Sequence, residues 1–257
     1  MKDWPESSSE EGLTRPPLRM AMDRVTDAMR WSRNASRLWL VGLGVLAVAL
    51  TGTAGQAGAA QMAEPLFWKT PYSGKPDGKT KGYLKAATRS GIAARFLVVK
   101  ERRAEGDEWL GLRLPTRPNR NVGWVRAEDF NVSRAKAKLI VNRDARTLTM
   151  FINGDRKWRT EVVVGKPSTP TPRGLFAIHD RHRVRDEYRP WIFETTAHSR
   201  KLRWFQGGPA RIALHGRHGD LRVPWGIAAS NGCIRTPDWA LRSIRKHAPP
   251  GTPLRIK

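Results

Sequence analysis

The chain has 257 residues, of which 39% are hydrophobic and 27% charged, an ordinary composition for a folded protein that excludes global disorder. Its 47 Lys and Arg outnumber 23 Asp and Glu, which gives a formal net charge of +24. Residues 134–257 alone hold 26 basic and 9 acidic side chains. Two explanations stay open: a polyanionic surrounding, or an Arg-rich composition without a specific partner. The single cysteine excludes an internal disulfide and a thiolate zinc cluster.

Residues 1–60 have the pattern of a leader followed by an export signal. Arg30, Arg33 and Arg37 precede an uncharged apolar run at 38–50, and small residues follow as far as Ala60. The run is shorter than the roughly 20 residues of a membrane span. We therefore expect a secretory signal, with an uncleaved anchor as the alternative. Residues 1–28 are either a short cytoplasmic tail or a misassigned start, because Met29 would begin a signal of ordinary length.

Residues 65–132 predict a small all-β module. Short apolar segments at 96–99, 108–114 and 122–125 are strand candidates, and turns containing Gly and Pro separate them. The runs Trp109-Leu110-Gly111 and Gly123-Trp124-Val125 resemble a bacterial Src-homology-3-like barrel. That resemblance implies either a structural spacer or a wall-attachment module. Ser133–Lys138 is the expected junction to the next domain.

Residues 137–257 predict a second β-rich domain with one short helix. Strands are expected at 139–141 and 148–152, joined by a hairpin with Asp144 in its turn, and at 160–164, 175–178 and 253–256. Asn153-Gly154 predicts a tight turn. Thr236 is the expected N-cap of a helix that ends before residues 249–251. The predicted fold class is mainly β: a signal or anchor segment, a small barrel, and a β-rich domain with a helix after the cysteine.

Two segments carry the chemistry of a thiol enzyme. The first ends in His215-Gly216, and the second runs from Ser230 to Arg235 with Cys233 inside it. A thiol needs a base or a positive environment to ionise at neutral pH, and an imidazole supplies both. The turn before Cys233 can direct backbone N–H groups at an oxyanion, and Arg235 adds a carboxylate-binding fork. Together these features predict cysteine-dependent acyl transfer.

At these residues the sequence resembles the L,D-transpeptidase (YkuD-type) catalytic domain over about residues 137–257. That family has a His, then 14–17 residues, then Ser/Thr-His-Gly-Cys with Arg or Asn two residues on. Here His215 precedes Cys233 by 18 positions. The upstream run Thr171-Pro172-x-Gly174 matches a turn of the family.

The resemblance implies a role for each matched residue. Cys233 is the expected nucleophile and His215 the base, with a backbone carbonyl orienting the imidazole because no acidic partner is apparent. The N–H groups of Gly232 and Cys233 are the expected oxyanion hole. Ser230 and Asn231 are expected to support this loop, and Arg235 and Gly216 to contact substrate. Asn231 stands where the family usually has a second His, and we expect its carboxamide to hold the turn.

The remaining histidines leave one rival base and no metal site. His218 could replace His215, but His215 ends an apolar run that would fix it. We expect four other histidines to be surface or loop residues, with a place for His179 and His182 along the substrate cleft as the alternative, and three tryptophans to be either cleft walls or core. No metal or organic cofactor is expected. The four other histidines are His179, His182, His198 and His247, and the three tryptophans are Trp191, Trp204 and Trp225.

The resemblance implies a peptidoglycan L,D-transpeptidase that forms 3→3 cross-links, or attaches groups to stem peptides, through a Cys233 thioester. Stem peptides would be donor and acceptor. Water as acceptor would instead give an L,D-carboxypeptidase, and a structural Cys233 would leave a basic, non-catalytic wall-binding protein. We expect export to the wall, the periplasmic space or the outer membrane face, with anionic wall polymer as a further partner. Nucleic acid is not expected, and membrane contact only if the signal is uncleaved.

Overall fold

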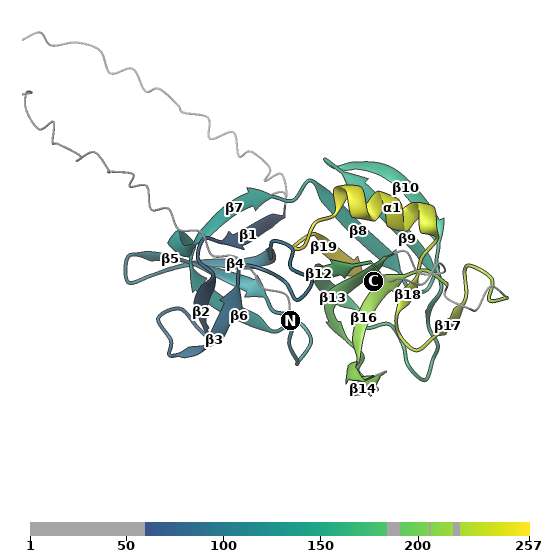
Figure 1. Cartoon of the computed structure of the whole chain (residues 1–257), viewed down its shortest axis with the longest axis horizontal. Coiled ribbons are helices and arrows are strands. Elements are labelled where there is room, and N and C mark those ends of the chain that lie inside the picture. The colour runs from purple at the N-terminus through teal and green to yellow at the C-terminus, as the bar shows by residue number, and fades with distance from the viewer. Residues whose placement is uncertain (1–59, 184–190, 206, 218–221) are drawn as a thin grey trace, which may run out of the picture. The chain divides into compact units, whose positions relative to one another are not determined.

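The computed structural model describes residues 60–183, 191–205, 207–217 and 222–257 (Figure 1). The predicted export signal at 38–50, Met29 and His218 lie outside these residues. All described residues belong to one compact unit, Thr53–Lys257. The predicted mainly β class is confirmed, and the described part of the chain contains a single α-helix. None of its helices is long and apolar enough to cross a membrane.

The first sheet has seven strands in the order β3-β2-β6-β5-β4-β1-β7, all paired antiparallel. The expected segments at 96–99, 108–114 and 122–125 are confirmed as parts of β4, β5 and β6. Sequence patterns missed the other four strands, of which two contain a proline that lowers strand propensity. The elements are β1 Gln61–Pro65, β2 Lys69–Ser73, β3 Thr80–Lys85, β4 Phe96–Ala104, β5 Asp107–Arg113, β6 Val122–Arg126, the 3₁₀ turn η1 Ala127–Asp129 and β7 Phe130–Arg134.

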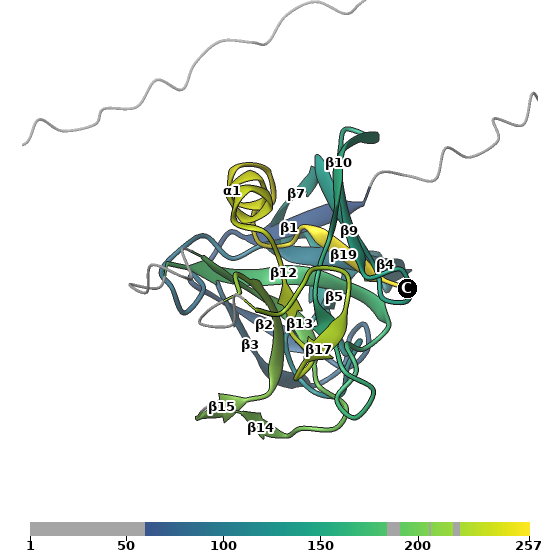
Figure 2. The same cartoon turned by 90° about the vertical axis from the view of Figure 1, so that its right-hand side faces the viewer.

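The second sheet has eight strands in the order β10-β9-β8-β19-β12-β13-β16-β18. Two parallel pairs, β19 with β8 and β16 with β18, join otherwise antiparallel neighbours. Short pairs β11–β17 and β14–β15 lie outside it; Figure 2 shows the latter hairpin projecting at the bottom of the view. The strands are β8 Ala137–Asn142, β9 Thr147–Ile152, β10 Asp155–Glu161, β11 Val164–Gly165, β12 Gly174–His182, β13 Ile192–His198, β14 Trp204–Phe205, β15 Gly208–Pro209, β16 Arg211–His215, β17 Ala228–Ser230, β18 Ile234–Arg235 and β19 Pro253–Ile256.

The turns at the start of the second sheet agree with the sequence, whereas one strand boundary does not. Residues 143–146 connect β8 to β9, and Asn142 Oδ1 accepts the N–H groups of Asp144 and Ala145. Asn153 and Gly154 both have positive φ, as a tight hairpin turn requires. Strand β10 begins directly after that turn at Asp155, not at Thr160, because pairing with β9 outweighs its charged side chains.

The single helix is α1, Asp238–His247, and its N-cap differs from the prediction. Pro237 occupies the N-cap, whereas Thr236 is fully buried and its hydroxyl donates to the Ile234 carbonyl. The expected cap is therefore wrong, because the buried threonine bonds backwards into the preceding strand. The helix ends before Pro249, as predicted, and buries Leu241 and Ile244.

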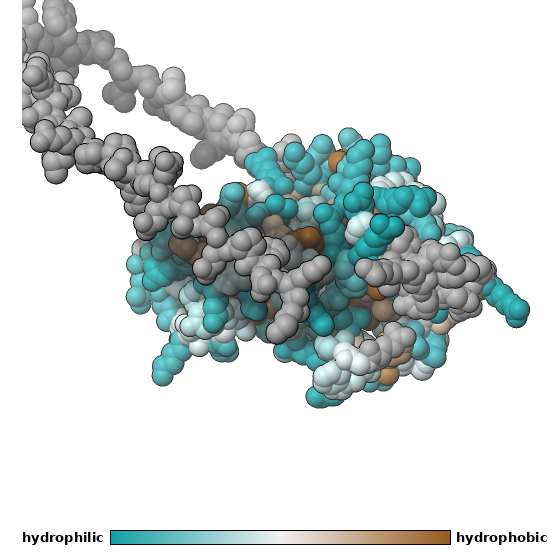
Figure 3. Space-filling view, in the orientation of Figure 1, coloured by the Kyte–Doolittle hydropathy of each residue, from teal (hydrophilic) through white to brown (hydrophobic). Residues whose placement is uncertain are grey.

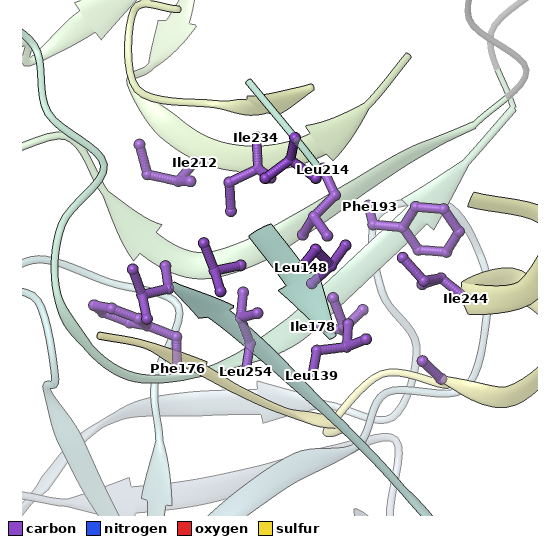
Figure 4. Packing of buried hydrophobic residues seen from close by; sticks show 14 of the residues in the cluster. Leu139, Leu148, Phe176, Ile178, Phe193, Ile212, Leu214, Ile234, Ile244 and Leu254 are labelled. Atoms are coloured by element: carbon purple, nitrogen blue, oxygen red, sulfur yellow. The ribbon is translucent and has the colours of Figure 1, made fainter. Parts of the chain in front are cut away.

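The core of the second sheet fixes which way the site residues face. Leu214 and Ile234 lie side by side among buried apolar side chains that include Leu148 and Phe193 (Figure 4). All four side chains are fully buried. Hydrophilic residues predominate on the face of the molecule in Figure 3. Because side chains alternate along a strand, the neighbours of Leu214 and Ile234 must face away from this core.

Side chains of the first sheet's connections hydrogen-bond to the second sheet. Asp180 of β12 is buried and accepts bonds from the hydroxyl of Thr88 at 2.7 Å and the hydroxyl of Ser90 at 3.0 Å. The Ser90 N–H adds a third bond, at 3.1 Å. These bonds tie residues that are about 90 positions apart in sequence.

Candidate active site

The site is built where β16 and β18 run parallel at the edge of the second sheet. Leu214 pairs with Ile234, and His215 pairs with Arg235. Since Leu214 and Ile234 point into the core, the alternation places His215, Arg235 and Cys233 on the opposite face. The two segments singled out in the sequence are therefore brought together by strand pairing.

Those three side chains line one cavity of about 510 Å³. The residues that line the cavity differ in charge: several carry cationic groups and one carries a carboxylate. Such a surrounding favours a thiolate over a thiol. The lining comprises His182, Ile192, Glu194, Ser199, Leu202, Phe205, Pro209, Ala210, Arg211, Ile212, Ala213, His215, Arg217, Ser230, Asn231, Cys233 and Arg235.

The turn before Cys233 is held by the Ser230 hydroxyl. Ser230 Oγ donates to the Cys233 carbonyl at 2.6 Å and accepts the Gly232 N–H at 3.1 Å. Gly232 has φ +118°, a conformation that side chains other than glycine's rarely adopt, and a Cβ there would lie 3.0 Å from Ile212 Cδ1. The half-buried Cys233 thiol lies 3.9 Å from the Arg211 carbonyl oxygen. The turn thus presents Cys233 to the cavity with little conformational freedom.

A second buried hydroxyl, that of Thr171, fastens this turn to the upstream loop. Thr171 Oγ1 donates to the Gly232 carbonyl at 2.8 Å and accepts the Gly165 N–H at 2.9 Å. Gly165 is needed for this approach, because a Cβ there would lie 2.3 Å from the Thr169 carbonyl oxygen. Thr171, in the Thr171-Pro172-x-Gly174 run, therefore holds the turn before Cys233 in place.

The imidazole of His215 is oriented by a carbonyl, as predicted. His215 Nδ1 lies 2.7 Å from the Gly216 carbonyl oxygen. A carbonyl only accepts, so the neutral imidazole carries its proton on Nδ1 and its lone pair on Nε2. The backbone of His215 is fixed too, since its carbonyl accepts the Thr236 N–H at 2.8 Å. This tautomer suits a general base.

Three expected site residues lie differently from the prediction. Asn231 is exposed and lines the cavity, but among the described residues the hydrogen bonds of the turn come from Ser230 and Thr171. The Gly232 N–H is engaged by Ser230 Oγ, so it does not point freely at an oxyanion. Gly216 is buried and orients His215; the cavity lining does not include it. Arg235 lines the cavity.

Sequence patterns missed two charged residues of the cavity, Glu194 and Arg211. Arg211 Nε lies 3.2 Å from Glu194 Oε2, and Arg211 Nη1 donates to the carbonyls of Pro115 and Thr195. Burial lowers the pKa of Arg211 from its ordinary value, and Glu194 opposes that change. Glu194 lies on β13 and Arg211 on β16, and a sequence pattern does not show that these strands pair. The apolar run before His215 was the single sequence feature that pointed to this region.

Of the histidines expected at the surface or in loops, His198 is buried in β13 and His179 is half-buried in β12. Burial, then the charge of Arg211, lowers the pKa of His179 to about 4. The same two causes, in the same order, lower the pKa of His198 to about 4. The surface or loop prediction is therefore wrong for His198, which is buried in a strand, whereas His179 lies in a strand and stays partly exposed. His182 lines the cavity, which agrees with the alternative position along the cleft and not with a solvated loop.

Only one of the three tryptophans takes a predicted position, because neither Trp204 nor Trp225 lines the cavity or packs against the core. Trp191 packs against the core, whereas Trp204 is 71% exposed. The guanidinium of Arg217 stacks over the Trp225 ring at 3.7 Å. Among the described residues no group of three His, Cys, Asp or Glu side chains is placed to hold a metal ion.

Comparison with known proteins finds a family model that matches the same segment. Residues 136–256 match the model of the L,D-transpeptidase catalytic domain (YkuD). This confirms the predicted resemblance for the domain that contains His215 and Cys233. No curated protein matches the chain.

Several solved structures are similar in part. The catalytic domain of an Enterococcus faecium L,D-transpeptidase is 20% identical and covers 48% of this chain and 98% of its own, with a TM-score of 0.35. A Mycobacterium smegmatis L,D-transpeptidase is 15% identical and covers 63% and 99%, with a TM-score of 0.38. L,D-transpeptidase 3 from Mycobacterium tuberculosis is 12% identical and covers 62% and 92%, with a TM-score of 0.41.

Proposed function

We propose that this protein is a peptidoglycan L,D-transpeptidase whose nucleophile is Cys233. The observation that carries the proposal is the cavity shared by Cys233 and His215, built by β16 and β18 inside the segment that matches the catalytic-domain family. The half-buried thiol faces a cavity lined by an imidazole and several guanidinium groups, which is the surrounding that a reactive cysteine needs.

The first half-reaction forms a thioester. The Cys233 thiolate attacks the carbonyl before the terminal D-residue of a tetrapeptide stem, and the C–N bond of that residue then breaks. D-Ala leaves with a proton from protonated His215 Nε2. The Cys233 N–H is the backbone donor proposed for the oxyanion, because the Gly232 N–H bonds to Ser230. Arg235 is proposed to bind the carboxylate of the stem.

The second half-reaction transfers the acyl group to an amine. His215 takes a proton from the amine of a neighbouring stem, the amine attacks the thioester, and the thiolate leaves as a new amide bond forms. With the side-chain amine at stem position three as acceptor, the product is a 3→3 cross-link. The reaction requires an exported enzyme, so residues 1–60 are proposed to act as signal or anchor and residues 65–132 as a spacer or wall-binding module.

Incubation with purified tetrapeptide muropeptides, followed by mass analysis, tests the proposal. We expect dimers that have lost one D-Ala for each cross-link, and no product from Cys233→Ala, which changes only the thiol. Tripeptides without dimers would instead identify an L,D-carboxypeptidase. Unchanged muropeptides with a folded wild-type protein would contradict an enzymatic role and favour a wall-binding protein.

A further inference from the structure

A second cavity, of about 550 Å³, is lined by Arg117, Pro118, Asn119, Arg120, Arg200 and Arg203. Four of its six lining residues are arginines, and no carboxylate lines it. The two segments that form it, 113–121 and 198–211, contain seven basic and no acidic residues. Guanidinium groups gathered without counter-charge repel one another, and an anion at their centre would relieve that repulsion. We call this the arginine cavity.

The arginine cavity is held open by hydrogen bonds between its two segments. Arg117 donates to the carbonyls of Ser199 and Leu202, each at 2.8 Å. Asn119 Nδ2 donates to the His198 carbonyl at 2.7 Å, and Asn119 Oδ1 accepts the His198 N–H at 2.8 Å. The cavity is therefore formed before a ligand arrives, which reduces the entropy lost on binding.

One segment, 199–203, contributes to the walls of both the arginine cavity and the cavity that contains Cys233, which we call the cysteine cavity. Ser199 and Leu202 line the cysteine cavity, while Arg200 and Arg203, from the same turn, line the arginine cavity. Trp204 follows directly and is 71% exposed, and its neighbour Phe205 lines the cysteine cavity. An exposed indole beside arginines suits a ligand that has sugar rings as well as charges.

We propose that the arginine cavity binds an anionic group, phosphate or carboxylate, of the cell-wall polymer that lies beside the substrate stem. The shared segment would hold the polymer next to Cys233 while its stem peptide enters the cysteine cavity. This inference rests on the proposed function for the identity of the polymer. The recognition itself follows from the four arginines that line this cavity, of which Arg117 also joins its two segments.

The test measures binding of fluorescent poly(glycerol phosphate) and polygalacturonate by anisotropy, with neutral dextran as the uncharged probe. The full chain carries Cys233→Ala, so the result does not depend on catalysis and its failure is distinct from failure of the proposed function. The site variant is Arg200→Gln with Arg203→Gln. The matched control is Arg156→Gln with Arg159→Gln, which removes the same charge from exposed positions on β10.

We expect the site variant to bind at least one of the charged polymers about tenfold more weakly or worse, and the control to bind within about twofold of the parent. The polymer with the larger loss identifies phosphate or carboxylate as the ligand. Equal losses in both variants would show that net charge alone attracts the polymer and would overturn the proposal, as would no loss in either. Tighter binding of single-stranded DNA, with the same dependence on Arg200 and Arg203, would overturn the assignment to a wall polymer.

Discussion

The two sheets differ in how they use buried polar side chains. Among the described residues, three polar or charged side chains are buried in the first sheet region (Thr70, Ser73 and Arg113), whereas eleven are buried from Thr147 onward. Strand pairing and an apolar core stabilise the first sheet. In the second, buried hydroxyls hold loops that no strand ladder supports, above all the turn before Cys233. Part of the polar interior of the second sheet, namely Thr171 and Ser230, therefore holds the turn of the site.

Thr171→Val, which removes one of the buried hydroxyls of the second sheet, should have the largest effect on stability. Valine keeps the shape of threonine but leaves the buried Gly165 N–H and Gly232 carbonyl without the Thr171 hydroxyl. We expect a loss of about 4 kcal/mol in the free energy of unfolding, since each unsatisfied group costs about 1–3 kcal/mol. Denaturant unfolding measures it.

Thr169→Val is the matched control for that experiment. Its hydroxyl lies 3.3 Å from the Ser230 carbonyl, which also accepts the Lys166 N–H at 2.9 Å. The expected loss is about 1 kcal/mol or less. Equal losses of stability in the two variants would show that the Thr171 hydroxyl contributes no more to the free energy of unfolding than that of Thr169.

Ser230→Ala should lower the rate of acylation by about a hundredfold, because it releases the turn that aims the Cys233 N–H and thiol. Asn231→Ala should change that rate by about twofold or less, as is usual for an exposed side chain. Stopped-flow acylation by a carbapenem measures both. A larger effect at Asn231 than at Ser230 would restore the role that the sequence predicted for the carboxamide.

Asp180→Ala should lower the free energy of unfolding by about 2 kcal/mol, because the carboxylate accepts three hydrogen bonds from Thr88 and Ser90. Asp144→Ala removes an exposed carboxylate that pairs with Arg173 and should cost about 0.5 kcal/mol. Thermal or denaturant unfolding compares them. If both cost the same, Asp180 does not fasten the two sheets.

The smallest predicted effect is a pH dependence from His179 and His198. Each has a folded-state pKa of about 4, below the ordinary 6.5, so above pH 6.5 both states are neutral and no term arises. As pH falls below 6.5 only the unfolded state binds protons, which destabilises the fold. Between pH 6.5 and 5.5 we expect a loss of about 1 kcal/mol for each histidine. Unfolding of His198→Gln at both pH values should show a smaller loss than wild type, and an identical loss would contradict the assignment.

The fold was predictable where local pattern decides it. The apolar runs at 139–141 and 148–152 indicate strands, Asn153-Gly154 specifies its turn, and two prolines and a glycine at 249–251 end α1. Strand β10 was placed too late because five of its seven residues are charged, and only its partner β9 makes it a strand. Long-range pairing of this kind leaves little trace in a local window.

The site was predictable in its reactive groups but not in its supports. The segments around His215 and Cys233 indicated a thiol and imidazole that act together, and both side chains line one cavity. The missing acidic partner correctly implied a carbonyl at the imidazole. Ser230 and Asn231 are neighbours with similar hydrogen-bonding ability, so sequence could not decide which one faces inward. Glu194 and Arg211 belong to strands that meet only through the fold.

The rate of Cys233 alkylation as a function of pH tests the central claim most directly, because the chain has one cysteine and every modification reports on it. With iodoacetamide, the account predicts rapid alkylation at pH 7 and a midpoint well below the ordinary thiol pKa of about 8.5. His215→Gln should slow the reaction at pH 7 by about tenfold or more. A midpoint at or above about 8.5 that His215→Gln leaves unchanged would contradict activation of Cys233 by His215.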